Sequence, residues 1–260
     1  MNDIIVGVVS SLAAILIIFI IQYFRKTFGV TKQQQLLNFG KEIMFIYAVR
    51  EEKIIHENGV LPRTSTEDFL AINKIQTILL KSSFKGEIIF RESRHFGEED
   101  RQRDLIFICG PFSNPGTKEV LSEIYKIHPI VPLFEKDPVT HRKYLIFGEE
   151  KLESNSYEII EECKIRKIKF EDVDIKDYGM IIKTRNPWAH DKMMLVLAGI
   201  RGIGTWGAAE CLSSNWRELY SRKRNDGKHS KKGDFAAIIE VTIKKGDIIS
   251  LYIRNMIDLD

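Results

Sequence analysis

The sequence predicts an α/β fold, with a mostly parallel sheet flanked by helices, an antiparallel hairpin at the C-terminal end and one transmembrane helix at the N-terminal end. Two short apolar runs, at residues 104–109 and 192–198, have the composition of strands buried on both faces of a parallel sheet. Each run is followed by a glycine-containing turn and a helical pattern. A third apolar run, at residues 4–24, is long enough to cross a bilayer as a helix.

The N-terminal run is predicted to be a retained membrane anchor. Asp3 precedes it and Arg25 and Lys26 follow it, whereas a cleavable signal peptide has basic residues first and a small-residue cleavage site afterwards. Because positive charge marks the cytoplasmic flank, we expect a single-pass protein of the cell membrane, with its N-terminus outside and its C-terminal domain in the cytoplasm. The alternative is a buried core helix.

The turn after the second apolar run is the strongest candidate for a binding site. Its glycines allow positive φ and close backbone approach, and a helix is predicted at 206–215. Free N–H groups at a helix N-terminus suit a phosphate or carboxylate. The candidate ligand-binding residues are Gly199, Arg201, Gly202, Gly204 and Thr205. The alternative is that the glycines only let the helix pack close to the sheet.

The turn after the first apolar run repeats this arrangement. It offers Gly110, Ser113, Asn114 and Thr117 before a helix predicted at 118–126, with Thr117 as its N-cap. Because the carboxyl ends of parallel strands share one edge of a sheet, we expect both turns to lie there, where such sheets bind ligands. The alternative is a simple turn and cap without a ligand.

An aromatic residue precedes the second run. Trp188, between Asn186 and His190, is predicted to lie next to the glycine turn, where its ring would stack on a base. A core tryptophan is the alternative.

Composition narrows the classes of partner. With 39 Lys and Arg against 36 Asp and Glu, the net charge is +3, so no nucleic-acid partner is expected. The three cysteines stand far apart, so we expect no disulfide framework and no zinc site, and no cofactor is indicated. Asp172, Asp174 and Asp177 are spaced closely enough to hold a hard cation, but the absence of a glycine-containing calcium loop favours a solvated turn and no metal.

Three segments are expected: residues 1–30 as anchor and flank, 31–62 as a juxtamembrane helical linker, and 63–260 as a cytoplasmic Rossmann-like domain. The helical linker is predicted from the spacing of Leu36, Phe39, Ile43, Tyr47 and Ile54. Ser65 and Asp68 form a capping pattern for a helix that ends near Lys81.

Shorter elements complete the prediction. Strands are expected at 86–90, 130–134, 144–147, 163–170 and 178–183, with the terminal hairpin at 235–243 and 247–253. The strand at 163–170 is predicted from alternating charged and apolar residues. Residues 91–103 are expected to be a charged loop, and the basic stretch 222–233 either a solvated loop or a segment close to anionic lipid head groups.

The motif Gly202-Ile203-Gly204-Thr205, with a strand before it and a helix after it, resembles the phosphate loop of the SLOG superfamily. That superfamily of Rossmann-like domains includes nucleoside-monophosphate phosphoribohydrolases and, in bacterial antiviral defence, nucleotide sensors fused to membrane helices. Gly110-Pro111 and Asn114 are similar to its first-strand turn. The enzymes carry Gly-Gly-x-Gly-Thr with a later glutamate, where this chain has Arg201 and Ala208. The resemblance therefore implies nucleotide binding without that hydrolysis.

Three functions follow from these features. The favoured one is a membrane-anchored sensor that binds a nucleotide-derived ligand and signals through self-association, with the lipid bilayer and further copies of the chain as partners. Small residues in the anchor and the hairpin strand at 247–253 are candidate contacts between copies. The second is a tethered enzyme using Glu210, His190 or one of the aspartates at 172–177; no complete set of catalytic groups is apparent. The third is an adaptor without a ligand.

Overall fold

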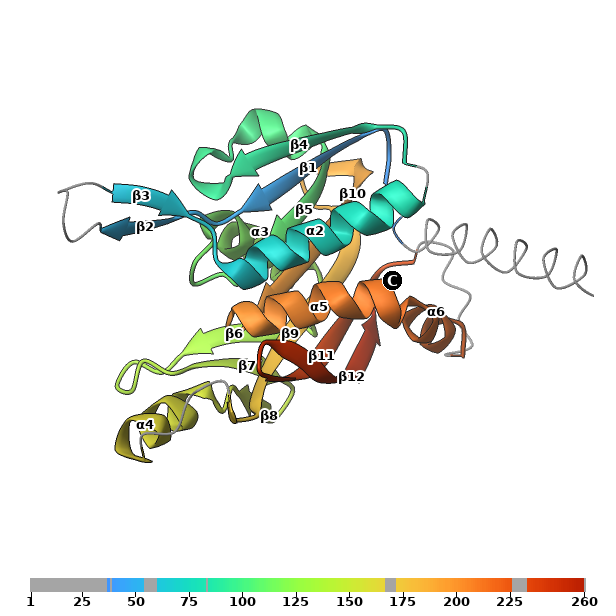
Figure 1. Ribbon diagram of the computed structural model, residues 1–260. Coiled ribbons are helices and arrows are strands. Elements are labelled where there is room, and N and C mark those ends of the chain that lie inside the picture. Colours follow the sequence, from blue (N-terminus) through green and yellow to red (C-terminus); the bar gives the residue numbers. More distant parts are fainter. Residues whose placement is uncertain are drawn as a thin grey trace, which may run out of the picture.

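A computed structural model describes residues 37, 39–53, 60–82, 84–166, 172–225 and 233–259 (Figure 1). These residues form an α/β structure in which helices cover both faces of a central sheet, as the sequence predicts. No helix within these residues is long and apolar enough to cross a membrane. The predicted anchor at residues 4–24 lies outside them.

The central sheet has seven strands in the order β12-β11-β9-β10-β5-β1-β4. One half of the sheet is parallel and consists of β4 (Glu87–Glu92), β1 (Glu42–Tyr47), β5 (Asp104–Ile108) and β10 (Ala189–Gly199). Antiparallel pairing continues the sheet through β9 (Ile175–Asn186), β11 (Phe235–Lys244) and β12 (Asp247–Asp258). The sheet is therefore mixed rather than mostly parallel, because a tight turn joins β9 to β10 instead of a helical crossover.

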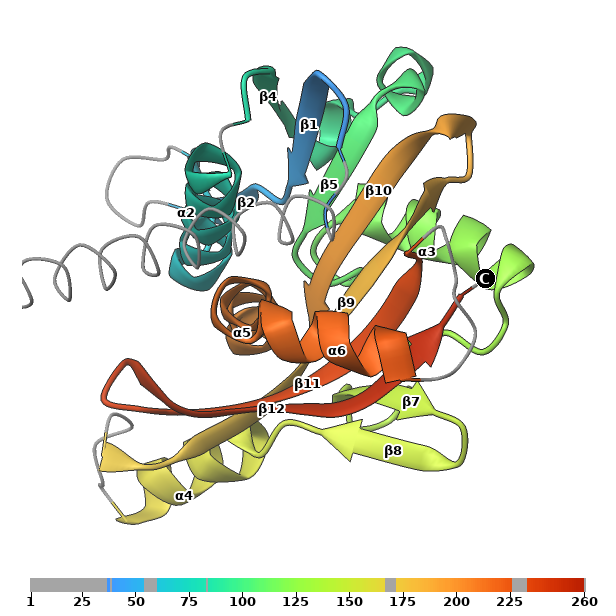
Figure 2. The same ribbon diagram turned by 90° about the vertical axis from the view of Figure 1, so that its right-hand side faces the viewer.

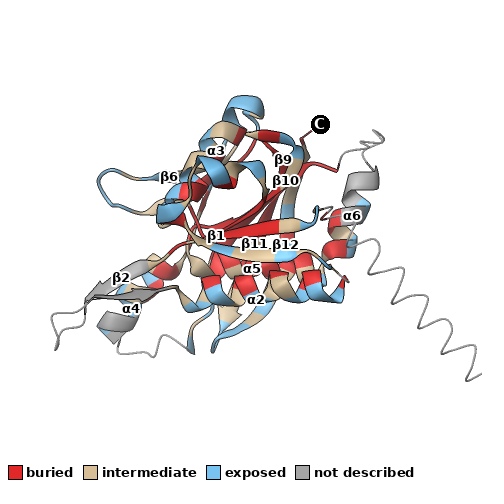
Figure 3. Ribbon diagram, turned by 90° about the horizontal axis from the view of Figure 1, so that it is seen from above, coloured by how far each residue is buried: buried red, intermediate tan, exposed pale blue. Residues whose placement is uncertain are grey.

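The helices are distributed over the two faces of this sheet. The helices α2 (Thr66–Lys81) and α5 (Gly202–Ser214) pack on one face, and α3 (Pro115–Ile127) packs on the other (Figure 2). The short helix α6 (Trp216–Asn225) follows α5. Two apolar clusters fill the space between the layers, and buried residues are concentrated in the strands and on the inner sides of α2 and α5 (Figure 3).

A smaller unit, which we call the small lobe, covers part of the α3 face. It consists of the antiparallel sheet β6 (Leu133–Lys136), β7 (Lys143–Phe147) and β8 (Glu150–Glu153), followed by α4 (Ser156–Arg166). Leu145 and Leu152 attach it to Tyr178, Ile200 and Ile238 of the main body. A separate ribbon of β2 (Arg50–Lys53) and β3 (Val60–Arg63) projects from the main body (Figure 1).

The largest error of the sequence prediction is at β1. Residues 42–47 and 50–53 are strands, so the expected helical linker at 31–62 is wrong there, and the sheet begins inside the segment assigned to the linker. Ile43 and Phe45 pack in one core cluster while Met44 and Ile46 pack in the other. A strand buried on both faces is a continuous apolar run, and such a run also satisfies helical spacing.

Several other elements differ in type or in bounds. Residues 163–166 belong to α4 rather than to a strand, and 167–171 lie outside the described residues. The helix after the second turn begins at Gly202, four residues earlier than predicted, and ends before α6. Two 3₁₀ helices, Ser93–His95 and Glu98–Gln102, occupy the expected charged loop. The α2 helix, with Ser65 as its N-cap, and the C-terminal hairpin are confirmed.

Candidate functional site

The strand order creates a switch point at one edge of the sheet. The chain leaves β1 towards α2 and returns in β4 on one side, whereas β5 lies on the other side of β1 and is followed by α3 on the opposite face. The carboxyl ends of β1, β5 and β10 therefore share one edge, which we call the carboxyl edge. Ligands of open α/β sheets bind outside the carboxyl ends of strands at such a point.

The two turns predicted from the sequence meet at the carboxyl edge. A Cβ atom at Gly110 would lie 2.4 Å from the carbonyl oxygen of Gly199, so the backbones of the two turns are in direct contact. Only glycine permits this approach at Gly110.

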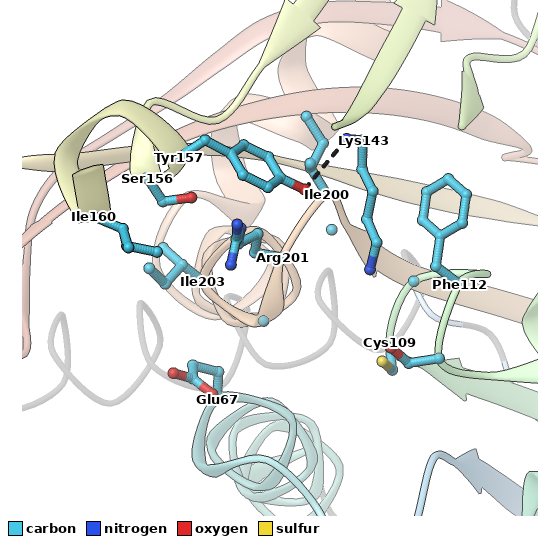
Figure 4. Close-up of a pocket in the computed structure, with 14 residues that line it drawn as sticks. Glu67, Cys109, Phe112, Lys143, Ser156, Tyr157, Ile160, Ile200, Arg201 and Ile203 are labelled. Carbon is cyan, nitrogen blue, oxygen red and sulfur yellow. Dashed lines mark hydrogen bonds between the residues drawn. The ribbon is translucent and has the colours of Figure 1, made fainter. Parts of the chain in front are cut away.

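A cavity of about 440 Å³ opens beside these turns, and it is bounded by the main body and the small lobe (Figure 4). Its lining residues are Cys109, Gly110, Phe112 and Ser113 after β5, Gly199, Ile200, Arg201, Gly202 and Ile203 after β10, Glu67 on α2, and Lys143, Ser156, Tyr157 and Ile160 in the small lobe. Its volume lies within the usual range for small-molecule sites.

Arg201 is held at the cavity by an aromatic ring rather than by an acid. Its guanidinium carbon lies 4.0 Å from the centre of the Tyr157 ring, and Figure 4 shows the two side chains stacked together. Within the described part of the chain, Arg201 forms no ion pair, and its buried Nε has no hydrogen-bond partner. The guanidinium therefore retains donors for an anionic ligand.

Lys143 adds a second positive charge from the small lobe. Its ammonium nitrogen lies 5.0 Å from the centre of the Phe112 ring, which belongs to the turn after β5. The backbone N–H of Lys143 donates a hydrogen bond of 3.2 Å to the Tyr157 hydroxyl. Tyr157 therefore contacts both cationic residues: its hydroxyl bonds to the backbone of Lys143, and its ring stacks on Arg201.

Asp177 is the hydrogen-bond acceptor for two backbone N–H groups at the start of α5. Its Oδ2 accepts hydrogen bonds from the backbone N–H groups of Gly204 at 2.7 Å and Arg201 at 3.1 Å. Burial raises the pKa of Asp177 to about 6, although the N–H groups of Gly204, Tyr178 and Arg201 favour its charged form. Asp177 lies in β9 and is fully buried, so the sequence prediction of a solvated turn at this residue is wrong.

Two N–H groups at the start of α5 remain beside the cavity. Gly202 and Ile203 are the first two residues of this helix, so their amides have no acceptor inside it. Both residues line the cavity. Glu67 lies close by, since a Cβ atom at Gly202 would be 3.0 Å from the Glu67 side chain. The cavity thus combines two cations, a helix N-terminus and one carboxylate.

Half of the predicted site residues line the cavity, namely Gly110, Ser113, Gly199, Arg201 and Gly202. The others have internal roles or stand elsewhere. Asn114, not Thr117, is the N-cap of α3, and its amide nitrogen donates to the carbonyl oxygens of Ile46 and Ile108. Thr117 and Thr205 are fully buried outside the cavity lining.

Gly204 and Trp188 also depart from the prediction. A Cβ atom at Gly204 would lie 2.1 Å from the carbonyl oxygen of Tyr178, so this glycine lets α5 pack against β9, the alternative weighed above. The expectation that Trp188 lies next to the glycine turn is wrong. It follows β9 at the amino end of β10, whereas Gly199 is at the carboxyl end, and its ring packs against Phe96 and Arg101.

The residues considered for a tethered enzyme do not gather at the cavity. Glu210 of α5 pairs with Lys74 of α2 at 2.7 Å, and His190 lies at the opposite edge of the sheet. Asp177 accepts a hydrogen bond from the backbone of α5. Among the described residues, no group of three or more His, Cys, Asp or Glu side chains has a metal-binding arrangement.

The sequence prediction missed nine of the fourteen lining residues, among them Glu67, Cys109, Lys143 and Tyr157. Lys143 and Tyr157 reach the cavity only through the packing of the small lobe, for which the sequence gives no local signal. Cys109 has a φ of 91°, a left-handed conformation that side chains rarely adopt. Such strained residues concentrate at functional sites.

No protein-family model matches this chain, and no match is found among curated proteins.

Proposed function

We propose that this protein is a membrane-anchored sensor whose cytoplasmic domain binds a nucleotide-derived anion in the carboxyl-edge cavity. The observation that carries the proposal is Arg201, which stands at this cavity without an acidic partner among the described residues. A guanidinium that is supported by a ring but not neutralised is suited to a phosphate.

Other groups at the cavity support the same class of ligand. Lys143 supplies a second cation, and the amides of Gly202 and Ile203 supply the N-terminal end of α5, which favours negative charge. Bare phosphate would make no use of Glu67, whereas a nucleotide brings hydroxyl and amino donors that a carboxylate accepts. Phe112 and Tyr157 add aromatic surface suited to a base.

The position of the cavity suggests how binding would be transmitted. A ligand held by Arg201 and Lys143 would join the main body to the small lobe and would favour one arrangement of the two. It can shift such an equilibrium only by as much as it binds one state more tightly. We propose that the favoured state self-associates and brings the anchors together. This scheme agrees with the resemblance of the second turn to nucleotide-sensing SLOG domains.

Native mass spectrometry of the protein purified from cells tests this function. We expect a co-purifying species with the mass of a nucleotide derivative, and its loss from Arg201→Ala. Arg217→Ala is the matched control, because Arg217 also stacks on an aromatic ring, at 5.3 Å from the centre of Trp216, but does not line the cavity. A species retained equally by both variants would argue against the proposed site.

A further inference from the structure

A second cavity, of about 330 Å³, opens at the edge of the sheet opposite the carboxyl edge. We call this the amino edge, because it contains the first residue of β5, Asp104, and the first half of β10. Met193 at this cavity and Gly199 at the other are six residues apart along β10, which corresponds to roughly 20 Å at about 3.3 Å per residue. The two cavities therefore face away from each other.

The chain enters the described structure at the amino edge. Phe39 and Gly40 line the second cavity, and the Gly40 N–H donates to Asp104 Oδ2 at 2.5 Å. Only residues 25–36 separate the predicted anchor from Leu37, which is packed in the core. Even fully extended, such a linker reaches roughly 45 Å. The amino edge is thus the part of the domain that is tied directly to the predicted membrane segment.

Basic side chains rim the same cavity. Arg185, His190 and Lys192 line it, and Arg185 and His190 are exposed. The Arg185 guanidinium donates to the backbone oxygen of His190 at 3.2 Å, which holds it across the β9–β10 turn. The acids at this cavity are Asp191, paired with Lys192 at 3.3 Å, and Asp104, whose oxygens accept from backbone N–H groups.

Residues 226–232 of the basic stretch lie outside the described residues, and the described chain resumes at this edge with Gly233, the last residue of the stretch. Asp234 follows and accepts hydrogen bonds from the Thr184 hydroxyl at 3.3 Å and the Arg185 N–H at 3.2 Å. Asp234 therefore stands beside the basic rim. Clusters of Lys and Arg close to a membrane segment are attracted to anionic lipids.

We propose that the amino edge lies on the bilayer, with phosphate groups of anionic lipids bound at the second cavity by Arg185 and Lys192. This inference rests on the proposed membrane anchor. It adds an orientation to that proposal, since the carboxyl-edge cavity then faces away from the bilayer and is open to a cytoplasmic ligand. The lipid phosphodiester is the complementary group for the Arg185 guanidinium, and it would replace Asp191 as the partner of the Lys192 ammonium.

Fluorescence quenching of the full chain in lipid nanodiscs tests the orientation. A fluorophore is attached to a cysteine introduced at His190, on the amino edge, or at Lys118, in the first turn of α3 on the carboxyl edge. The background carries Cys163→Ser, because Cys109 and Cys211 are buried. The discs contain phosphatidylcholine with or without phosphatidylglycerol, and the quencher is a nitroxide on the lipid head group.

We expect the label at position 190 to be quenched several-fold more than the label at 118 in discs containing phosphatidylglycerol. The double variant Arg185→Glu, Lys192→Glu should remove most of this difference, whereas the control Lys118→Glu should preserve the quenching at 190. Equal quenching at both positions, or quenching at 190 that is unaffected by the double variant, would overturn the inference while the anchor stands. A chain that does not enter the discs would instead refute the anchor and both proposals.

Discussion

Asp177 occupies a position at the start of α5 where a ligand anion was expected from the sequence. Its buried carboxylate accepts hydrogen bonds from the backbone N–H groups of Arg201 and Gly204, so these two groups cannot donate to a bound phosphate. The part of this helix that lines the cavity is consequently limited to Gly202 and Ile203, with the Arg201 side chain before them. A carboxylate so deeply buried also makes the stability of the fold depend on pH.

The direction of that dependence follows from the raised pKa. Because the pKa of Asp177 rises from 3.8 to about 6 on folding, its contribution to stability is fully present below pH 3.8 and is lost as the pH rises through about 6. The loss amounts to roughly 3 kcal/mol for a shift of about two units. Asp177→Asn should remove this component, which denaturant unfolding at about pH 4 and about pH 7 measures. Identical pH dependence in variant and wild type would contradict this role for Asp177.

At the scale of elements, glycines fix how closely α5 approaches the sheet. Cβ atoms at Gly179 and Gly204 would lie 2.0 Å from the Gly204 oxygen and 2.1 Å from the Tyr178 oxygen, so β9 and α5 touch through their backbones at this point. The contact carries Arg201 to the cavity, because Arg201 is the N-cap of α5. The glycine motif thus positions the site without contacting a ligand at Gly204.

Substitution of Gly204 therefore tests packing rather than binding. Gly204→Ala should destabilise the fold by about 1–3 kcal/mol or more, because the added methyl group must displace backbone atoms. Gly97→Ala is the control: a Cβ atom there meets nothing within 4 Å, and we expect a change within about 0.5 kcal/mol. Thermal and denaturant unfolding provide the measurement. A neutral Gly204→Ala would contradict the close approach of α5 to β9.

The elements that sequence reasoning recovered are those with strong local signals. The strands β5 and β10 are bounded apolar runs, and α2 has a capping serine with an apolar face. The apolar run of the strand β1 also fits helical spacing, because both faces of this strand are buried. In α4 the alternating pattern at its end suggested a strand, but the packing of Ile159 against Ile203 favours the helix.

The sequence predicts only the part of the site that is formed by the turns directly after β5 and β10. Because β5 and β10 are parallel, the turns after them lie at the same edge of the sheet. The sequence therefore predicts that Gly110, Ser113, Gly199, Arg201 and Gly202 lie together, and all five line the cavity. Tyr157 supports Arg201 from a helix in the small lobe, and Asp177 bonds to amides 24 and 27 residues further along the chain. Such tertiary partners leave no periodic pattern.

For the whole molecule, β12 matters because it forms one edge of the central sheet. Ile249 and Tyr252 on this strand are 53% and 62% exposed, which is unusual for large apolar residues on a long edge strand. An edge of this kind can pair with the same strand of a second copy. This is the surface through which we expect copies of the chain to associate.

Cross-linking in membranes tests this association. Ile249→Lys combined with Tyr252→Lys should reduce cross-linked dimers several-fold, because charges on an edge strand oppose pairing. Val139→Lys is the matched control, since Val139 is 84% exposed in the loop between β6 and β7. If both variants form dimers as the wild type does, association does not use the β12 edge.

The central claim is that Arg201 receives the anionic group of a nucleotide at the carboxyl-edge cavity. Calorimetric titration of nucleoside monophosphates and diphosphates into the wild type, Arg201→Ala and Arg217→Ala tests it most directly. Loss of one charge-assisted contact costs roughly 1.5–3 kcal/mol. We therefore predict binding to the wild type and to Arg217→Ala, with an affinity for Arg201→Ala lower by roughly 10- to 100-fold. Equal affinities for all three proteins, or no binding to any of them, would contradict the account.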